Sequence, residues 1–226
     1  TTQGNAAHNR NNHPFAGQVP GSRFALAHNG VLYNDLLLRR SHGLPHTRIE
    51  TDSYVAVQLI EQQKALTPAS LRQMAETVEG SFVFTVLDEQ DDLYVIKGDN
   101  PFCLLHFPRL GLYLYASTET ILRQAVARTW LRWEQAEKVS IDSGDILSIN
   151  CRGEIQIDHF EMGWTLYPHC RSWRQVSACL PEPRYLEQLK SVAASFGYTA
   201  EQIDQLLLEG WSTDEIEDAL YCYDYL

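Results

Sequence analysis

The segment His28-Asn29-Gly30 contains residue types that can stabilise a negatively charged oxygen. It closes a short apolar run, residues 23–28, which is typical of a strand. A strand that ends in Asn-Gly exposes a side-chain amide and a backbone N–H. Two such donors that converge on one point stabilise the oxygen that forms when a nucleophile attacks an amide carbonyl. The alternative is a plain turn, because Asn-Gly is among the strongest turn dipeptides.

Asp52 is the second residue that could do chemistry, in the segment Glu50-Thr51-Asp52-Ser53. This segment stands where a helix is predicted to begin. An acid there usually caps the helix or complements its dipole. The alternative is that Asp52 binds the ammonium group of a substrate. Thr51 can act as the cap, which would leave Asp52 free for that role.

The elements that must position these residues follow from hydrophobic periodicity and turn signals. Helices are predicted over residues 32–40, from about residue 51, after Thr67-Pro68, and from Ser117 to Arg128. Strands are predicted in three pairs, at 81–87 with 93–96, 102–107 with 112–116, and 145–149 with 154–160. Helices followed by a meander of strands indicate an α+β fold with a largely antiparallel sheet.

The C-terminal part has a different character. Residues 161–183 show no sustained period and contain three prolines, so we interpret them as a linker. Residues 184–226 are predicted to form an acidic three-helix extension. Residues 182–226 hold ten acidic and two basic side chains, a net charge of −8. The segments Gly197–Ile203 and Gly210–Ile216 echo each other, and each combines a helix-ending Gly with a Ser/Thr capping box.

Composition excludes several classes of function. The formal charge of −11 disfavours nucleic acid as a partner. No apolar run is long enough to cross a bilayer, so no membrane is expected. Five scattered cysteines without a C-x-x-C pair suit reduced thiols and a cytoplasmic location, and they predict no metal site.

Several segments, taken together, resemble the glutaminase domain of class II glutamine amidotransferases, which are N-terminal-nucleophile hydrolases. In chain order they are Thr2-Gln3-Gly4, Asn12–Phe15, Ala27-His28-Asn29-Gly30, Glu50–Ser53, Gly98–Phe102 and Ala116–Glu119. The resemblance covers roughly residues 1–150, and we expect the domain to extend over residues 1–160. It implies a four-layer αββα sandwich that needs neither a metal nor another cofactor.

The resemblance also implies roles for individual residues. Asn29, through its side chain, and Gly30, through its backbone, match the oxyanion hole. Asp52 matches the aspartate that holds the α-ammonium of glutamine. Thr2 and Gly4, with Gln3 beside them, match the lining of the pocket for the glutamine carboxylate. The family's nucleophile is an N-terminal Cys whose own amino group acts as the base. That Cys is expected to lie before Thr1, which makes residues 1–160 an N-terminally incomplete domain.

Two functions are therefore expected. The first is hydrolysis of the glutamine side-chain amide to glutamate and ammonia. The ammonia would pass to a separate synthetase, or the protein would act as a free-standing amidotransferase-like hydrolase. The alternative is an inactive amidotransferase fold that binds or regulates another protein through its acidic helical tail.

Overall fold

The computed structural model describes residues 4–5, 7–162, 183–208, 211, 216 and 219–220. They fall into two compact units, one that ends at residue 162 and one that begins at residue 183. The predicted linker, residues 161–183, lies almost entirely outside the described residues. The predicted domain boundaries at residues 160 and 184 therefore stay a prediction.

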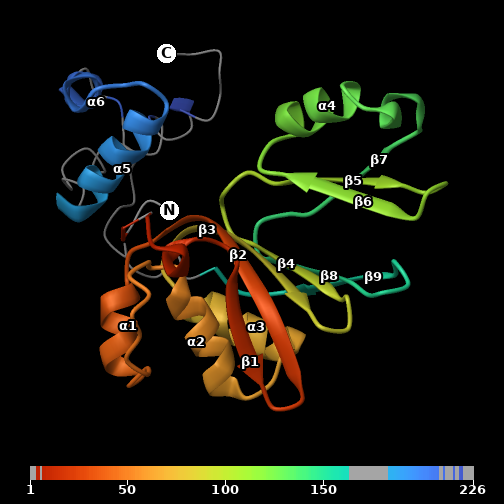
Figure 1. The fold of residues 1–226 in the computed structure, drawn as a ribbon, viewed down its shortest axis with the longest axis horizontal. Coiled ribbons are helices and arrows are strands. Elements are labelled where there is room, and N and C mark those ends of the chain that lie inside the picture. Colours follow the sequence, from red (N-terminus) through yellow and green to blue (C-terminus); the bar gives the residue numbers. More distant parts are fainter. Residues whose placement is uncertain are drawn as a thin grey trace. The chain divides into compact units, whose positions relative to one another are not determined.

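A six-stranded sheet with the order β1-β2-β3-β4-β8-β9 forms the centre of the first unit (Figure 1). Its strands are β1 (Phe15–Val19), β2 (Ser22–Leu32), β3 (Gly80–Asp88), β4 (Leu93–Lys97), β8 (Asp145–Ile149) and β9 (Ile155–His159). Every neighbouring pair is antiparallel, so the prediction of an α+β fold with antiparallel sheets is confirmed. The β-branched and aromatic residues that predicted β3 and β4 are those that pack best on a pleated surface.

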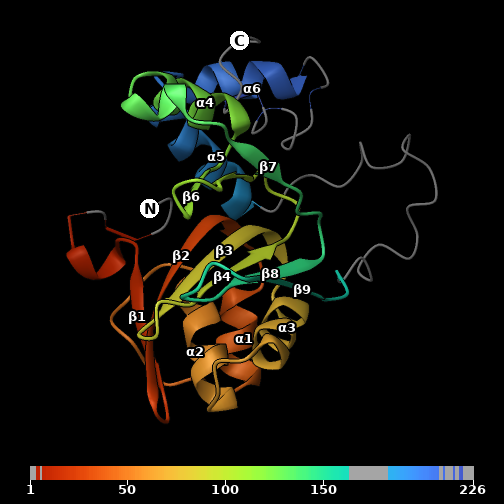
Figure 2. The same ribbon diagram turned by 90° about the vertical axis from the view of Figure 1, so that its right-hand side faces the viewer.

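Three helices cover one face of this sheet (Figure 2). They are α1 (Asp35–Ser41), α2 (Tyr54–Gln63) and α3 (Pro68–Thr77). A capping box between Thr67 and Ser70 begins α3, with Pro68 in its first turn. The main apolar core lies between these helices and the sheet, and its fully buried members include Leu26, Phe84, Ile96, Ile60 and Leu71.

A second sheet, with the order β6-β5-β7, packs against the other face of the large one. Its strands are β5 (Cys103–Phe107), β6 (Leu112–Ala116) and β7 (Glu137–Val139). Leu104 joins Val83, Val95 and Leu147 of the large sheet in one apolar cluster. On the far side of β5, Leu105 and Phe107 contact α4 (Glu119–Ala127) and the 3-10 helix η2 (Trp130–Trp133).

Two predictions about the segment around Asn29-Gly30 were wrong. Strand β2 does not end there but continues to Leu32, and it pairs with β3 over the whole stretch. Helix α1 begins at Asp35 rather than Leu32. The cause is long-range pairing, because the neighbouring β3 extends the strand through a dipeptide whose local preference is a turn.

The second unit contains α5 (Pro183–Ser195) and α6 (Ala200–Leu208). Its own apolar core is formed by Leu189, Ala193, Ile203, Ile216 and Leu220. The first predicted capping box is present, since Thr199 and Gln202 exchange hydrogen bonds of 2.7 and 3.3 Å at the start of α6. The second copy, around Ser212–Glu215, lies outside the described residues, and so does most of the predicted third helix.

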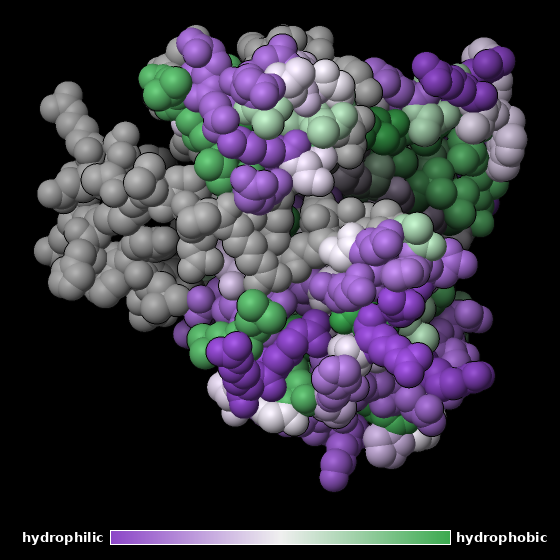
Figure 3. Space-filling view, turned by 60° about the vertical axis from the view of Figure 1, so that its left-hand side comes forward, coloured by the Kyte–Doolittle hydropathy of each residue, from purple (hydrophilic) through white to green (hydrophobic). Residues whose placement is uncertain are grey.

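On the face shown in Figure 3, hydrophobic residues form small patches among hydrophilic ones, and they gather into one larger patch toward the upper right-hand edge. Within the described part of the chain, no helix is long and apolar enough to span a membrane.

Candidate functional site

The pairing of β2 with β3 shows to which side the Gly30 N–H points. Gly30 lies opposite Phe82 in the register of the two strands. The main-chain groups of Phe82 bond on the β4 side. Its N–H donates to Asp99 Oδ1 (3.1 Å), and its C=O accepts the Gly98 N–H (3.0 Å). Gly30 and Phe82 therefore form a non-hydrogen-bonded pair, and the Gly30 N–H points away from β3.

The edge of β2 that faces away from β3 is paired with β1 only as far as Leu26, opposite Phe15. Gly30 and Leu32 lie beyond that point, and because they are two residues apart their N–H groups point to the same side. Asp52 fills one of these positions, since its Oδ2 accepts the Leu32 N–H at 2.7 Å. The two N–H groups stand about 7 Å apart along the strand. The structure thus brings Asp52 to the strand edge that carries Asn29 and Gly30.

Asp52 is a buried carboxylate with one well-bonded oxygen. The residue is 2% exposed, and its Oδ1 is 3.5 Å from the Ser53 hydroxyl. Burial raises the pKa of Asp52 above its ordinary value, the Leu32 N–H opposes the shift, and the negative charge of Asp35 adds to it. A cation beside the carboxylate would lower the pKa again, so this position favours a positively charged group.

Thr51 does not cap the helix, in contrast to the prediction. The N-cap of α2 is Ser53, which makes no side-chain cap hydrogen bond. The Thr51 hydroxyl is buried without a hydrogen-bond partner. Asp52 Oδ2 also accepts the Leu32 N–H, a contact that the sequence did not predict. The prediction missed this because a contact over 20 residues leaves no trace in local spacing.

His28 is a site residue to which the sequence assigned no role of its own. It is 7% exposed and stacks on Phe84, with 4.6 Å between ring centres. Its Nδ1 is 2.8 Å from the Ser53 hydroxyl, and its Nε2 has no hydrogen-bond partner. Burial lowers its pKa to about 3, the charge of His13 adds to this, and the Ser81 carbonyl opposes it. His28 is therefore neutral near pH 7, and it joins β2 to the Asp52 segment.

Of the three residues predicted to line a carboxylate pocket, Thr2 and Gln3 lie outside the described residues. Gly4 is described and lies against the Glu50 segment, where a Cβ would come within 2.9 Å of Glu50 Cβ. The fully buried Asn11, in the 3-10 helix η1 (Asn9–Asn11), ties the two segments together. Its Nδ2 donates to Glu50 Oε2 (2.8 Å) and to the Asn5 carbonyl (3.0 Å), and its Oδ1 accepts the Glu50 N–H (3.1 Å). The N-terminal segment is thus anchored two residues from Asp52.

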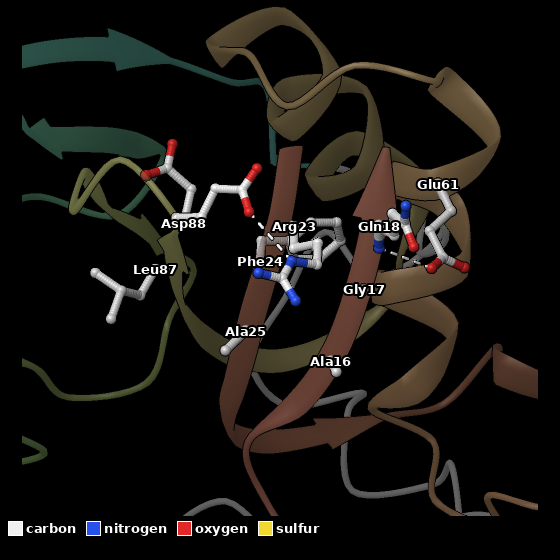
Figure 4. A pocket seen from close by; sticks show the side chains of 10 residues that line it. Ala16, Gly17, Gln18, Arg23, Phe24, Ala25, Glu61, Leu87 and Asp88 are labelled. Carbon is white, nitrogen blue, oxygen red and sulfur yellow. Dashed lines mark hydrogen bonds and ion pairs between the residues drawn. The ribbon is translucent and has the colours of Figure 1, made fainter. Parts of the chain in front are cut away.

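Other candidate sites offer little chemistry. Cys103 is 2% exposed in β5, and burial raises the pKa of its thiol, as expected of a core residue rather than a nucleophile. No cluster of three or more His, Cys, Asp or Glu side chains suited to a metal occurs within the described ranges. An open hollow lies at the β1–β2 turn end of the sheet (Figure 4). The side chains of Arg23 and Glu89, which form an ion pair, are among the residues that line this hollow. None of the predicted site residues lines it.

Comparison with known proteins decides the family. Residues 6–123, just over half of the chain, match the family described as "Glutamine amidotransferase domain". The chain belongs to this family. The curated proteins to which this chain is similar in sequence are class II amidotransferases.

Two curated relatives indicate the extent of the likeness. An amidophosphoribosyltransferase from Methanothermobacter thermautotrophicus is 28% identical over 148 residues, which cover 62% of this chain and 29% of that protein. A glutamine–fructose-6-phosphate aminotransferase from Listeria innocua is 34% identical over 103 residues, 42% of this chain and 17% of that protein. The chain thus spans less than a third of the length of either relative.

A solved structure supports the fold. The glutamine phosphoribosylpyrophosphate amidotransferase from B. subtilis, complexed with ADP and GMP, superposes with a TM-score of 0.56 at 22% identity. The match covers 70% of this chain and 33% of that one. At this identity the likeness concerns the fold alone.

Proposed function

We propose that this amidotransferase domain binds glutamine and hydrolyses its side-chain amide to glutamate and ammonia. The observation that carries the proposal is the place of Asp52, whose carboxylate is buried at the same edge of β2 as the Gly30 N–H. An ammonium-binding group and an oxyanion donor about 7 Å apart suit a ligand of the size of an amino acid.

The chemistry assigns one role to each group. A nucleophile adds to the amide carbon of glutamine, and the carbonyl oxygen gains the negative charge. The Asn29 side-chain amide and the Gly30 N–H donate hydrogen bonds to that oxygen. The C–N bond then breaks, the nitrogen leaves as ammonia after taking up a proton, and water releases glutamate from the acyl intermediate. Asp52 holds the α-ammonium, and Thr2, Gln3 and Gly4 line the carboxylate pocket.

The family resemblance supplies the nucleophile. It implies an N-terminal Cys, and we propose that this Cys is encoded ahead of Thr1. The buried Cys103 is a poor candidate, because its thiol has a raised pKa. The order of apolar clusters, with helices, large sheet, small sheet and helix in succession, supports the four-layer αββα arrangement of this class.

The acceptor of the ammonia is a separate matter. The two curated relatives are named for transfer to a sugar phosphate or phosphoribosyl substrate, and this domain corresponds to less than a third of each. We propose that a synthetase component takes up the ammonia, either in the same polypeptide or as a separate partner, in the cytoplasm.

A second function is favoured by one observation. The C-terminal helices have their own core, yet Leu208 of α6 is 83% exposed. This supports the alternative in which the acidic extension binds a partner protein and the glutaminase site is inactive.

The test uses the natural gene product, with any residues encoded before Thr1, and glutamine labelled with ¹⁵N in its side chain. Release of labelled ammonia is expected. Asn29→Ala should lower kcat by about 10²–10³, the usual cost of one oxyanion donor, with little change in KM.

The matched control for this test is Asn150→Ala in the β8–β9 turn, which also removes a side-chain amide and should leave both constants unchanged. Absence of labelled ammonia from a folded protein that carries the N-terminal Cys would reject the glutaminase proposal. It would leave the binding alternative.

A further inference from the structure

Asn100 contacts the strand that carries the proposed oxyanion donors, from a segment far along the chain. It follows β4, in the sequence Gly98-Asp99-Asn100. Its Nδ2 donates to the main-chain carbonyl of Asn29 at 2.8 Å, and its Oδ1 accepts a short hydrogen bond from the Ser81 hydroxyl. The Asn29 carbonyl also takes part in the β2–β3 pairing, where Asn29 lies opposite Val83.

The orientation of the Asn100 amide follows from its partners. A backbone carbonyl can only accept, so the atom that faces Asn29 must be the amide nitrogen. The oxygen then faces Ser81, whose hydroxyl can donate. Because both ends of the amide are engaged, the side chain is held in one orientation.

The segment that carries Asn100 is itself firmly braced. The Gly98 N–H donates to the Phe82 carbonyl at 3.0 Å, and Asp99 accepts the Phe82 N–H. A Cβ at Gly98 would lie 2.4 Å from the Phe82 carbonyl oxygen, so the backbone approaches as closely as Gly permits. Lys97 Nζ also donates to the Gly98 carbonyl, at 2.9 Å. Asn100 therefore acts from a rigid support.

The peptide bond between Asn29 and Gly30 connects this contact to the proposed site. In a trans peptide the C=O and the following N–H point in opposite directions within one plane. A donor that holds the Asn29 C=O on one side therefore directs the Gly30 N–H to the other side, the open edge of β2. Gly30 has φ +135°, a conformation that L side chains rarely adopt, so β2 departs from regular strand geometry here and the contact with Asn100 supplements the pairing with β3 in holding this plane.

We propose that Asn100 is a positioning residue for the oxyanion site, which fixes the direction of the Gly30 N–H through the Asn29 carbonyl. This inference rests on the proposed function. Asn100 touches no reacting atom in this scheme. Its contribution is to hold the Gly30 donor in place before the negative charge develops, and such preorganisation is the source of oxyanion stabilisation.

The experiment substitutes Asn100→Asp, which keeps an acceptor for Ser81 but replaces the donor to Asn29 by a carboxylate oxygen. The matched control is Asn34→Asp. Asn34 is also buried, its Nδ2 donates to the Thr77 carbonyl at 3.1 Å, and its Oδ1 accepts the Glu79 N–H at 3.0 Å. Both variants lose one amide-to-carbonyl hydrogen bond and gain one charge.

Two measurements separate a positioning role from a structural one. For Asn100→Asp, kcat for glutamine hydrolysis should fall about 10- to 100-fold, while KM stays near the wild-type value. The loss is smaller than the roughly 10²–10³ expected on removal of a donor, because the Gly30 N–H is misdirected but still present. The ¹⁵N–¹H residual dipolar coupling of Gly30, which reports the direction of its N–H bond without any need for activity, should change. In Asn34→Asp, kcat and the Gly30 dipolar coupling should both stay near their wild-type values.

An unchanged Gly30 coupling, or a loss of kcat equal to that of Asn34→Asp, would overturn the inference even in an active enzyme. A wild-type protein without glutaminase activity would defeat the proposed function instead, and the dipolar coupling would still decide the role of Asn100. Should Asn100→Asp fail to fold, Asn100→Ser, whose side chain lacks the amide, takes its place with the same expected results.

Discussion

Substitution Asp52→Asn tests the proposed glutamine site most directly, because it removes a charge with little change of shape. The Asn oxygen can still accept the Leu32 N–H that Asp52 Oδ2 binds at 2.7 Å. The end of β2 should therefore keep its structure. What is lost is the negative charge that would face the α-ammonium of glutamine.

The magnitude follows from the burial of Asp52, which is 2% exposed. Truncating one partner of a buried, hydrogen-bonded charge pair costs about 2–5 kcal/mol. Because each 1.4 kcal/mol is about tenfold, KM for glutamine should rise at least about 30-fold. The oxyanion donors are untouched, so kcat at saturating glutamine should change less than KM.

The assay compares glutamine with glutaramic acid, which is glutamine without its α-amino group, as a competitive inhibitor. In the wild type, glutamine should bind much more tightly than glutaramic acid. In Asp52→Asn this difference should disappear, because the variant no longer distinguishes a ligand with an ammonium group from one without it.

Asp145→Asn is the matched control. Asp145 is also buried, at 8% exposed, and its Oδ2 accepts a backbone N–H, that of Asp142, at 2.8 Å. This variant should keep the preference for glutamine. If Asp52→Asn keeps that preference too, no ammonium binds at Asp52 and the reasoning fails.

Stability supplies an independent check. Burial raises the pKa of Asp52 above 3.8, so the folded state binds this proton more tightly than the unfolded state does. Stability therefore falls as the pH rises from 3.8 through the raised pKa, and the cost remains at pH 7. Asn carries no such cost. Urea unfolding at pH 7 should show Asp52→Asn to be at least as stable as the wild type.

Three further predictions concern the same region. His28 has a pKa of about 3 in the folded state and 6.5 in the unfolded state, so the free energy of unfolding should fall by up to about 1.4 kcal/mol for each unit that the pH drops below 6.5. His28→Gln should make this dependence weaker, as urea titrations at pH 7 and pH 5 would show. Gly30→Ala places a Cβ 1.9 Å from the Ser81 carbonyl oxygen and should lower Tm far more than Gly21→Ala, where φ is also positive (+84°) but nothing lies within 4 Å. Asn11→Ala removes the anchor of the N-terminal segment, so it should speed proteolysis there and raise KM for glutamine.

Local signals in the sequence predicted the elements well. The hairpin of β3 and β4, the pairs β5–β6 and β8–β9, and the capped starts of α3 and α4 all lie close to their predicted positions. Strands β1 and β7 went unpredicted, because five- and three-residue strands with Gly, Gln, Glu or Lys have little apolar pattern. Their existence depends on partners elsewhere in the chain.

The site was predictable only in part, and the reason is sequence separation. Asn29, Gly30 and Asp52 were found through resemblance, and their spacing alone favours a turn and a helix cap. The contact of Asn100 with Asn29 spans 71 residues, and that of Asn11 with Glu50 spans 39. Nothing in local periodicity marks such pairs. They depend on how the whole chain folds, since Asn11, Glu50 and Asn100 all lie outside the strands.

The unfavourable features of the domain help to decide between an active site and an inactive scaffold. Three buried side-chain polar atoms in the described part of the chain have no hydrogen-bond partner, and two of them, His28 Nε2 and Thr51 Oγ1, belong to this site. The third, Glu134 Oε2, still has Arg109 at 3.8 Å.

Gly30, with its positive φ inside a strand, and Asp52, with its raised pKa, are further costs in the same place. Unsatisfied polar groups and buried charges each reduce stability by kilocalories unless something binds to them. A scaffold kept only for packing would gain by replacing them with apolar residues. Their concentration at one strand edge therefore favours a site that binds a polar, charged ligand over an inactive fold.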